Sequence, residues 1–373
     1  MSTKSTSLLY ILKIVLCLGL IIFIVVGAFF QLPANVHYHV AESYTFSGGD
    51  MDTPVYLGVM LPKSGPYQQV ENIHITWDGA LQKNAFNFVD AVKLSGMKRT
   101  GEDLVATIEY EVTLPQGYVS WSAPVEGFQR LPQAGIESDC ECIQEKAASI
   151  TDKGKLGGNA YKIYSFTAEN LVYKRENIDC TGLSALSALK NGSCVCSGYA
   201  RLMTALCRAS DIPSQMVLGL VYPDPMFSSN ITSFPQNPYE AHAWVEYYSE
   251  GSWKMADPTW GAKRLNFMQF NRNDSRHLVY GELEHVLAVD ADLELWALGQ
   301  AKFMLGEAHC FRYIAVSDSK QISFLPEVSI QRKWDGRWLN TLVAWGITTW
   351  VIFKYRSKII GLPNLVTRLE KQP

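Results

Sequence analysis

The feature that most constrains the fold of this chain is a change of hydrophobic period at Pro213. Before this proline, residues 197–209 carry apolar side chains at helical spacing, and we predict a helix there. After it, residues 217–222, 243–248 and 253–255 have the character of strands. A block of helices followed by an antiparallel meander is typical of the α+β class, which we predict here.

The region before this core has a different pattern. Residues 55–61, 73–77 and 104–114 are strand-like runs, separated by turn clusters rich in glycine, serine and proline. Several short strands with such punctuation favour a small β-sandwich, which we interpret as a spacer or recognition module. The predicted divisions of the middle of the chain are a β-sandwich over 32–135, a core domain over 136–300 and a β-rich tail over 301–336.

The N-terminus has the features of a membrane segment. Residues 8–30 are almost entirely apolar, close to the roughly 20 residues that a spanning helix needs. Lys4 and Lys13 lie on the amino side, so the positive-inside rule predicts that residues 1–31 are a cytoplasmic end and an anchor. A cleaved signal peptide is the alternative, with a small-residue site at 26–28. The length of the apolar run favours the anchor.

A second apolar stretch lies near the other end of the chain. Residues 338–353 are rich in tryptophan, and Lys354 and Arg356 follow closely. We predict a second transmembrane helix over 337–356, with a basic cytoplasmic tail over 357–373. Because the stretch is short and contains threonines, an interfacial helix is the alternative. In either case we expect terminal hydrophobic helices in contact with membrane lipid, and a middle region that is periplasmic or extracellular.

Charge and cysteine content narrow the class further. The formal net charge is -3 and no long basic or acidic run occurs, so we expect no nucleic-acid partner. Of the eight cysteines, Cys17 lies in the N-terminal apolar run, and seven remain for a compartment in which thiols tend to pair. Seven is odd, so at least one thiol stays free. The Cys-x-Cys spacings at 140/142 and 194/196 do not match the usual zinc pattern, and we expect no metal.

Cys196 stands immediately before the predicted helix at 197–209. A thiol at a helix N-terminus meets the positive end of the helix dipole and unpaired backbone N–H groups, which stabilise the thiolate and lower the pKa. The same N–H groups can hold a developing oxyanion. Cys194 is the competing thiol, but it lies outside the helix start and is better explained as a structural or bridging cysteine. Considered alone, Cys196 is explained more simply as a buried core cysteine.

His242 and Asp257 change that interpretation. They lie on two strand-like runs joined by a turn that contains Gly251. If the turn centres between Glu250 and Gly251, Trp244 faces Asp257 across the hairpin, and His242 is the diagonal neighbour of Asp257 on the same face. A carboxylate in that position can fix the imidazole tautomer and stabilise the imidazolium.

His277 is a conceivable alternative base. It stands in a densely polar stretch over 272–278, with no predicted strand to hold it in place. We therefore interpret His277 as part of a solvated turn.

The order of these motifs resembles the transglutaminase-like superfamily. The similarity runs over roughly 140–260 and is specific because three motifs follow one another. Its parts are Gly192-x₃-Cys196-x-Gly198-Tyr199-Ala200, the helix end and strand entry at 206–213, His242-Ala243-Trp244-Val245-Glu246 and Asp257-Pro258-Thr259-Trp260. The resemblance implies a papain-like α+β fold, with the cysteine at a helix start and the histidine and aspartate on a sheet.

The resemblance also implies a chemistry, namely acyl transfer through a thioester. Cys196 is then the nucleophile, His242 the general base and Asp257 the residue that orients the histidine. Similar proteins often have a tyrosine at the position of Tyr173. We expect the side chains that contact substrate to be Tyr173, Trp244 and Trp260.

The expected partner is a peptide or protein substrate, and no cofactor is expected. Calcium is doubtful, because the sequence has no recognisable calcium-ligand cluster. Hydrolysis of a peptide or isopeptide amide is the favoured reaction, and glutamine–lysine cross-linking is the second. A non-catalytic, membrane-tethered scaffold of the same fold is the non-enzymatic alternative.

Overall fold

Strand pairing between the two ends of the chain organises the fold. In the computed structural model, β1 (Asn35–Gly48) lies between β6 (Leu104–Tyr118) and β17 (Ile322–Arg332), antiparallel to both. The apolar residues of β1 alternate along the strand, and its buried face is part of the main core. β3 (Gln69–Thr76) and β13 (Arg272–Asp274) pair with β6 and complete a five-stranded sheet.

The residues described by the structure are 35–85, 90–152, 156–174, 184–221, 240–262, 269–307, 312–333, 350 and 354. Residues 35–333 form one compact unit.

A second five-stranded sheet also joins distant parts of the sequence. Its order is β15 (Phe303–Glu307), β16 (Tyr313–Ser317), β2 (Thr53–Leu61), β5 (Asp90–Lys98) and β4 (Ala80–Ala85). The ring of Tyr313 in this sheet lies 5.5 Å from Tyr44 and 5.5 Å from Phe324 in the first sheet. A sandwich made of residues 32–135 alone is therefore not confirmed, because both sheets include strands from the expected tail at 301–336.

The core between these strands is mixed α and β, as the change of period predicts. Within the described residues, helices α2 to α5 are followed by four strands of a five-stranded sheet, whose order is β14-β10-β11-β12-β7, and its edge strand β7 precedes the helices in the sequence. The helices are α2 (Glu141–Ile150), α3 (Leu156–Asn170), α4 (Ala185–Asn191) and α5 (Cys196–Ala209). The strands are β7 (Ser120–Trp121), β10 (Ser214–Val221), β11 (Glu240–Ser249), β12 (Ser252–Ala256) and β14 (His277–Glu282).

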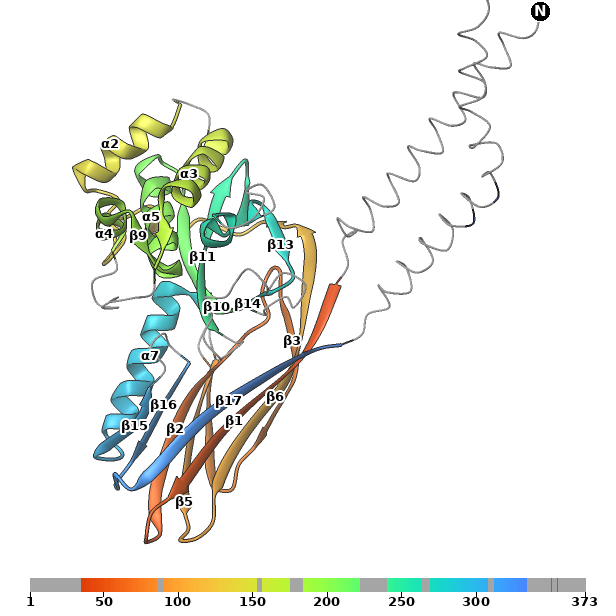
Figure 1. The fold of residues 1–373 in the computed structure, drawn as a ribbon, viewed down its shortest axis with the longest axis vertical. Helices are drawn as coiled ribbons and strands as arrows, with labels where there is room; N and C mark the ends of the chain where they lie inside the picture. The colour runs from red at the N-terminus through yellow and green to blue at the C-terminus, as the bar shows by residue number, and fades with distance from the viewer. Residues whose placement is uncertain are drawn as a thin grey trace, which may run out of the picture. The chain divides into compact units, whose positions relative to one another are not determined.

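Further elements complete this part of the chain. They are a 3₁₀ turn η1 (Gly127–Gln129), the parallel pair β8 (Val172–Tyr173) and β9 (Ser193–Cys194), the short helix α6 (Pro258–Gly261) and the helix α7 (Leu283–Leu298). α7 contacts β2 and β16 on one side and β10 and β14 on another, so it joins the core sheet to the second β sheet (Figure 1).

Helix α5 is the centre of the core. It packs on β11 and is surrounded by α2, α3 and α4 (Figure 1). The apolar side chains at helical spacing along this helix are all fully buried, namely Tyr199, Leu202, Met203 and Leu206. Arg208 holds the turn into β10, since its guanidinium donates to the carbonyl oxygen of Ser214 at 2.8 and 2.9 Å. The helix and strand predicted on either side of Pro213 are therefore confirmed.

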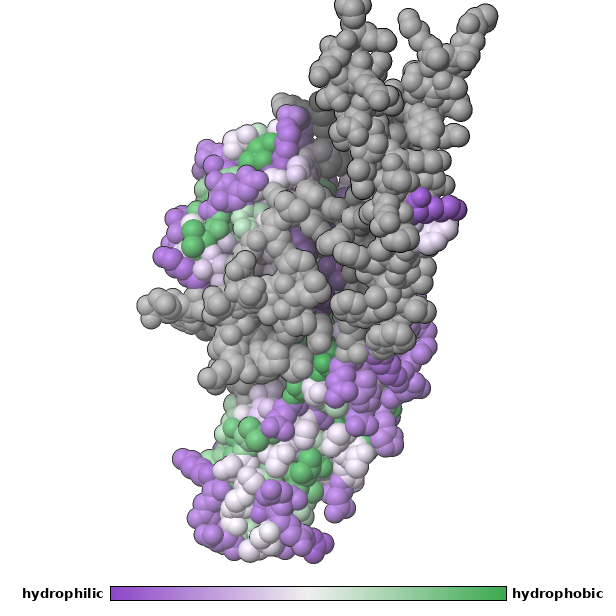
Figure 2. Space-filling model, turned by 45° about the vertical axis from the view of Figure 1, so that its right-hand side comes forward, coloured by the Kyte–Doolittle hydropathy of each residue, from purple (hydrophilic) through white to green (hydrophobic). Residues whose placement is uncertain are grey.

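No helix within the described residues is both long and apolar enough to span a membrane. The expected anchor at 8–30 lies outside the described residues, and so does the stretch at 338–353 apart from Trp350. On the face drawn in Figure 2, hydrophobic and hydrophilic residues of the described part are intermixed. Such a mixture is usual for protein surfaces.

Candidate active site

The N-terminus of α5 presents Cys196. Gly192 ends α4 in the left-handed conformation, with φ 62°, and the chain then enters the short strand β9. Val195 is the extended N-cap residue, and Cys196 is the first residue of the helix, half-buried. A Cβ atom added at Gly198 would lie 2.5 Å from the Cβ atom of Cys194. Gly198 is therefore needed so that Cys194 can pack against the helix start.

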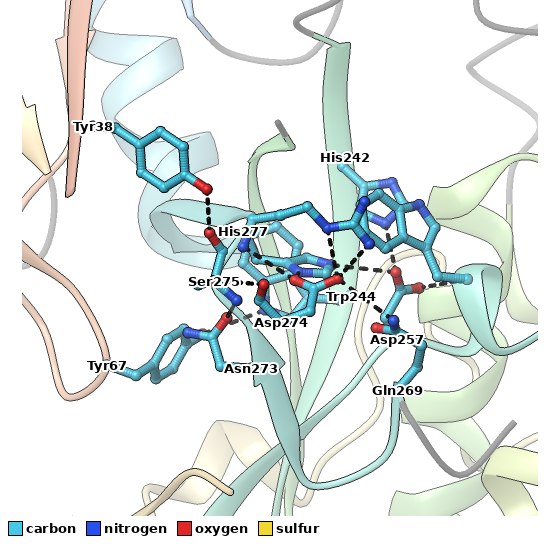
Figure 3. Close-up of polar contacts among 12 residues, drawn as sticks. Tyr38, Tyr67, His242, Trp244, Asp257, Gln269, Asn273, Asp274, Ser275 and His277 are labelled. Atoms are coloured by element: carbon cyan, nitrogen blue, oxygen red, sulfur yellow. Dashed lines mark hydrogen bonds and ion pairs between the residues drawn. The ribbon is translucent and has the colours of Figure 1, made fainter. Parts of the chain in front are cut away.

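The β11–β12 hairpin brings His242 and Asp257 together in the predicted register. Ser249 pairs with Ser252, so Glu250 and Gly251 form the two-residue turn, and both have positive φ. This is the conformation of the type I′ turns that suit a tight hairpin. His242 Nε2 lies 2.9 Å from Asp257 Oδ2 (Figure 3).

The second carboxylate oxygen of Asp257 is bound by backbone. Asp257 is the N-cap of α6, and its Oδ1 accepts hydrogen bonds from the backbone N–H groups of Thr259 at 2.9 Å and Trp260 at 3.2 Å. The side chain is 1% exposed. The carboxylate is thus held on both oxygens before any substrate arrives.

His242 also reaches the thiol. The side chain of Cys196 is hydrogen bonded to the imidazole of His242 and to the backbone N–H of Ala243. Because Nε2 of His242 faces Asp257, Nδ1 is the ring nitrogen left for the sulfur. The structure thereby places the three predicted residues in the order Cys196, His242, Asp257.

Charges within this group favour a thiolate beside an imidazolium. Burial by itself would raise the pKa of Cys196, but the hydrogen bond and positive charge of His242 outweigh it and hold that pKa below its ordinary value. Burial would lower the pKa of His242, but the charge of Asp257, with further hydrogen bonds, raises it to about 10. Both shifts favour the thiolate–imidazolium pair over the neutral thiol–imidazole pair.

Residues 144–258 match the family model described as the transglutaminase-like superfamily. This domain belongs to that superfamily. The fold agrees: a structure from Cytophaga hutchinsonii, named as a candidate cysteine protease, has a TM-score of 0.50 at 16% identity, covering 82% of this chain and 94% of that one. The periplasmic domain of TgpA from Pseudomonas aeruginosa has a TM-score of 0.32 at 17% identity, covering 64% and 93%. No curated protein matches the chain.

His277 corrects the prediction of a solvated turn. It is the first residue of β14, it is fully buried, and it pairs with Val221 of β10. Its Nε2 lies 3.2 Å from Asp257 Oδ2, the same oxygen that faces His242 (Figure 3). The apolar residues Leu278 and Val279 that follow were the available signal for a strand, and the polar stretch before them masked it.

Gly219 of β10 makes room for the rings around this histidine. Trp244 extends across Gly219, and its ring lies 4.9 Å from that of His277. A Cβ atom at Gly219 would lie 2.1 Å from the carbonyl oxygen of Leu278 and 2.5 Å from Cη2 of Trp244. Neither backbone nor a fully buried indole can move cheaply.

We expect Gly219→Ala to destabilise the fold by about 1–3 kcal/mol, the usual cost of overpacking a filled core. Urea unfolding followed by tryptophan fluorescence measures this. The matched control is Gly127→Ala, because a Cβ atom at Gly127 meets nothing within 4 Å. Equal unfolding midpoints for the two variants would show that the Gly219 contact is not restrictive.

The three expected substrate-contact residues differ in position. Trp244 is fully buried and donates from Nε1 to the hydroxyl of Tyr67 at 3.3 Å, so its role is packing, and the expectation of substrate contact needs correction. Trp260 is 5% exposed, with its ring 5.6 Å from that of His242. Tyr173 is half-buried in β8 and pairs with Cys194. Of the three, Tyr173 and Trp260 remain proposals for substrate contact.

The ligand atoms of His242, Asp257 and His277 lie within 4.8 Å of one another, a spacing that could also suit a metal ion. These atoms already hydrogen bond to one another, so they need no metal to be satisfied.

The other described cysteines differ from Cys196. Burial raises the pKa of Cys194 to about 12, with the charge of Cys196 adding to the effect, and burial raises that of Cys207 to about 12. Cys140 Sγ and Cys142 Sγ lie 2.8 Å apart, and their hydrogen bond lowers the pKa of Cys140. All five described cysteines are free thiols, and the cysteines at 17, 180 and 310 lie outside the described residues. The structure therefore has no bridge among the described cysteines, and pairing that involves the cysteines at 180 and 310 stays a prediction.

Proposed function

We propose that this chain is a cysteine enzyme that cleaves a peptide or isopeptide amide through a thioester on Cys196. The observation that carries the proposal is the arrangement of half-buried Cys196 with buried His242 and Asp257 at the start of α5, in which the thiol has a lowered pKa and the imidazole a raised one. A thiolate is the nucleophilic form of cysteine, and an imidazolium beside it is already a proton donor.

The reaction follows from these protonation states. The Cys196 thiolate attacks the amide carbonyl carbon, and the oxyanion that forms is expected to accept hydrogen bonds from backbone N–H groups at the start of α5. The His242 imidazolium gives its proton to the leaving amine, which departs as the thioester forms. His242, now neutral, takes a proton from water, and the resulting attack releases the acid and restores the thiolate. Asp257 keeps the imidazole in one orientation throughout.

The test separates hydrolysis from cross-linking. The full-length enzyme is incubated with glutamine- and lysine-containing peptides, with and without a fluorescent primary amine, and the products are identified by mass spectrometry. We expect new carboxylic acid ends, with little amine incorporated. Predominant amine incorporation would identify a cross-linking enzyme, and the absence of both products over a broad peptide set would favour the scaffold. The Cys196→Ala variant is the control for background reaction.

We further propose that residues 8–30 anchor the chain in a membrane and that residues 36–332 lie outside the cytoplasm. The support is the apolar run with Lys4 and Lys13 on its amino side. A reporter that is active only after export, fused after Gln31, is expected to be active. A reporter signal confined to the cytoplasm would refute the proposed topology, and the pairing of cysteines would lose its basis.

A further inference from the structure

A chain of alternating charges leads away from Cys196 through the buried part of the domain. Beyond Asp257, the second histidine His277 places Nδ1 3.0 Å from Asp274 Oδ1. Asp274 Oδ2 in turn accepts from Arg276 Nε at 3.1 Å and Nη2 at 2.8 Å. Figure 3 shows His277 between the two carboxylates of Asp257 and Asp274.

The hydrogen bonds of His277 determine its protonation. A neutral imidazole has one N–H, so one of its nitrogens would direct a lone pair at a carboxylate. Both contacts are hydrogen bonds only if both nitrogens carry protons. The ring is fully buried, so solvent cannot relieve a mismatch. Burial alone would lower the pKa of His277, but the charge of Asp274 and the hydrogen bonds to both carboxylates raise it.

The surroundings of His277 support that charge state. Asp257 precedes α6, and Asp274 ends β13. The cations nearby are His242 of β11, whose ring lies 5.6 Å away, and Arg276, whose guanidinium stacks 4.3 Å over the ring of Trp260. The charges of His277 and Arg276 thus face those of two aspartates. Tyr164 of α3 and Cys196 of α5 interact electrostatically with Asp257. The other rings that contact His277 are those of Trp244 and Trp260, and neither carries a charge.

We propose that His277 is held as an imidazolium and is a positioning residue of this active site. Its N–H donates to the Asp257 oxygen that faces His242 and fixes the position of that oxygen. Its positive charge offsets part of the negative charge of Asp257 and so limits how far Asp257 raises the pKa of His242. The inference deepens the proposed function, because it explains how a buried aspartate can hold two cationic imidazoles. His277 acts through Asp257 and does not touch the substrate.

The proposal fixes the sign of a measurable change. Removing one positive charge from this buried group raises the pKa of Cys196, because the thiolate loses a favourable interaction. The loss of a nearby charge in a site with an effective dielectric constant of about 20 typically shifts a pKa by on the order of one pH unit. We expect His277→Gln to move the acid limb of Cys196 alkylation to higher pH by about that amount. A purely structural role would lower the amplitude and leave the limb in place.

The direct test is the protonation state of His277 in the wild-type full-length protein. Nitrogen NMR of ¹⁵N-histidine-labelled protein distinguishes imidazolium from neutral tautomers, and the other histidines are assigned by single His→Gln variants. We expect the His277 signals to show two protonated nitrogens throughout pH 6–8. A neutral tautomer at pH 7 would overturn the proposal. This readout needs no substrate, so its failure is distinct from failure of the proposed function.

Alkylation by iodoacetamide, with the Cys196 adduct quantified by mass spectrometry, gives the second readout. The matched control is His285→Gln, because His285 also bonds a carboxylate, Glu282, at 3.0 Å, away from the triad. We expect the limb to move in His277→Gln and to stay in His285→Gln. If His277→Gln does not fold, Asp274→Asn provides the test, and loss of the His277 imidazolium signals is expected there. An unmoved limb in a folded His277→Gln protein, or a stoichiometric metal ion bound by the wild type, would contradict the proposal.

Discussion

Replacement of Cys196 by alanine is expected to abolish acyl-enzyme formation and to lower turnover by several orders of magnitude. In enzymes that form a covalent intermediate, loss of the nucleophile has cost on the order of 10⁶ in kcat. The fold should survive, because Cys196 is only half-buried and alanine is a good helix former at the start of α5. Turnover of an amide substrate and the mass of the enzyme after rapid acid quenching measure the two effects.

Cys194→Ala is the matched control for that variant. Cys194 stands two residues earlier, is 2% exposed and packs against Gly198, so its removal leaves a small cavity and an intact triad. We expect its stability to fall by about 1 kcal/mol and its turnover to stay near that of the wild type. Wild-type turnover in Cys196→Ala would refute the assignment of the nucleophile.

Substitutions of His242 and Asp257 are expected to impair turnover for different reasons. His242→Ala removes the proton donor, typically worth about 10²–10⁴ in rate. Asp257→Asn keeps the shape but replaces one oxygen with an amino group. That group must face either the His242 and His277 nitrogens or the two backbone N–H groups of α6, and all of these are donors. We expect both variants to be severely impaired, with His242→Ala the slower.

The pH dependence of kcat/KM distinguishes the wild type from Asp257→Asn by the direction in which its alkaline limb moves. Activity should rise as Cys196 ionises, at a pH below the ordinary range for a thiol, and should fall as His242 loses its proton near pH 10. Asp257 raises the pKa of His242, so Asp257→Asn should move the alkaline limb to lower pH. The measurement is kcat/KM across pH 5–11. Wild-type turnover with an unmoved alkaline limb in Asp257→Asn would make the carboxylate purely structural.

Local patterns in the sequence were enough to predict the register that makes His242 and Asp257 neighbours, whereas the placement of Cys196 beside His242 was implied only by the family resemblance. The turn at Glu250 and Gly251 sets the hairpin register, and register decides which side chains share a face. His242 and Asp257 therefore become neighbours from information contained in a short segment. The helix start at Cys196 is equally local, since it depends on hydrophobic period and on what precedes the helix.

The features that sequence reasoning missed depend on contacts between strands and side chains that are far apart in the sequence. Alternation predicts that β1 is a strand, but it does not name β17 as a partner from the other end of the chain. The burial of His277 requires β14 to pair with β10 and Gly219 to lack a side chain under Trp244. Trp244 was expected at the substrate for the same reason: its burial results from packing against Tyr67, far away in the sequence.

The most direct test of the central claim is to map the adduct of an electrophilic amide mimic. The full-length wild-type protein is treated with a peptide probe in which a thiol-reactive carbonyl replaces the scissile amide, and the modified residue is identified by peptide mass spectrometry. Cys140, whose pKa is also lowered, is the internal comparison, because it has no histidine among its hydrogen-bond partners. We predict one adduct per chain, on Cys196, and its loss in His242→Ala. An adduct on Cys194 or Cys140 with Cys196 unmodified would contradict the account.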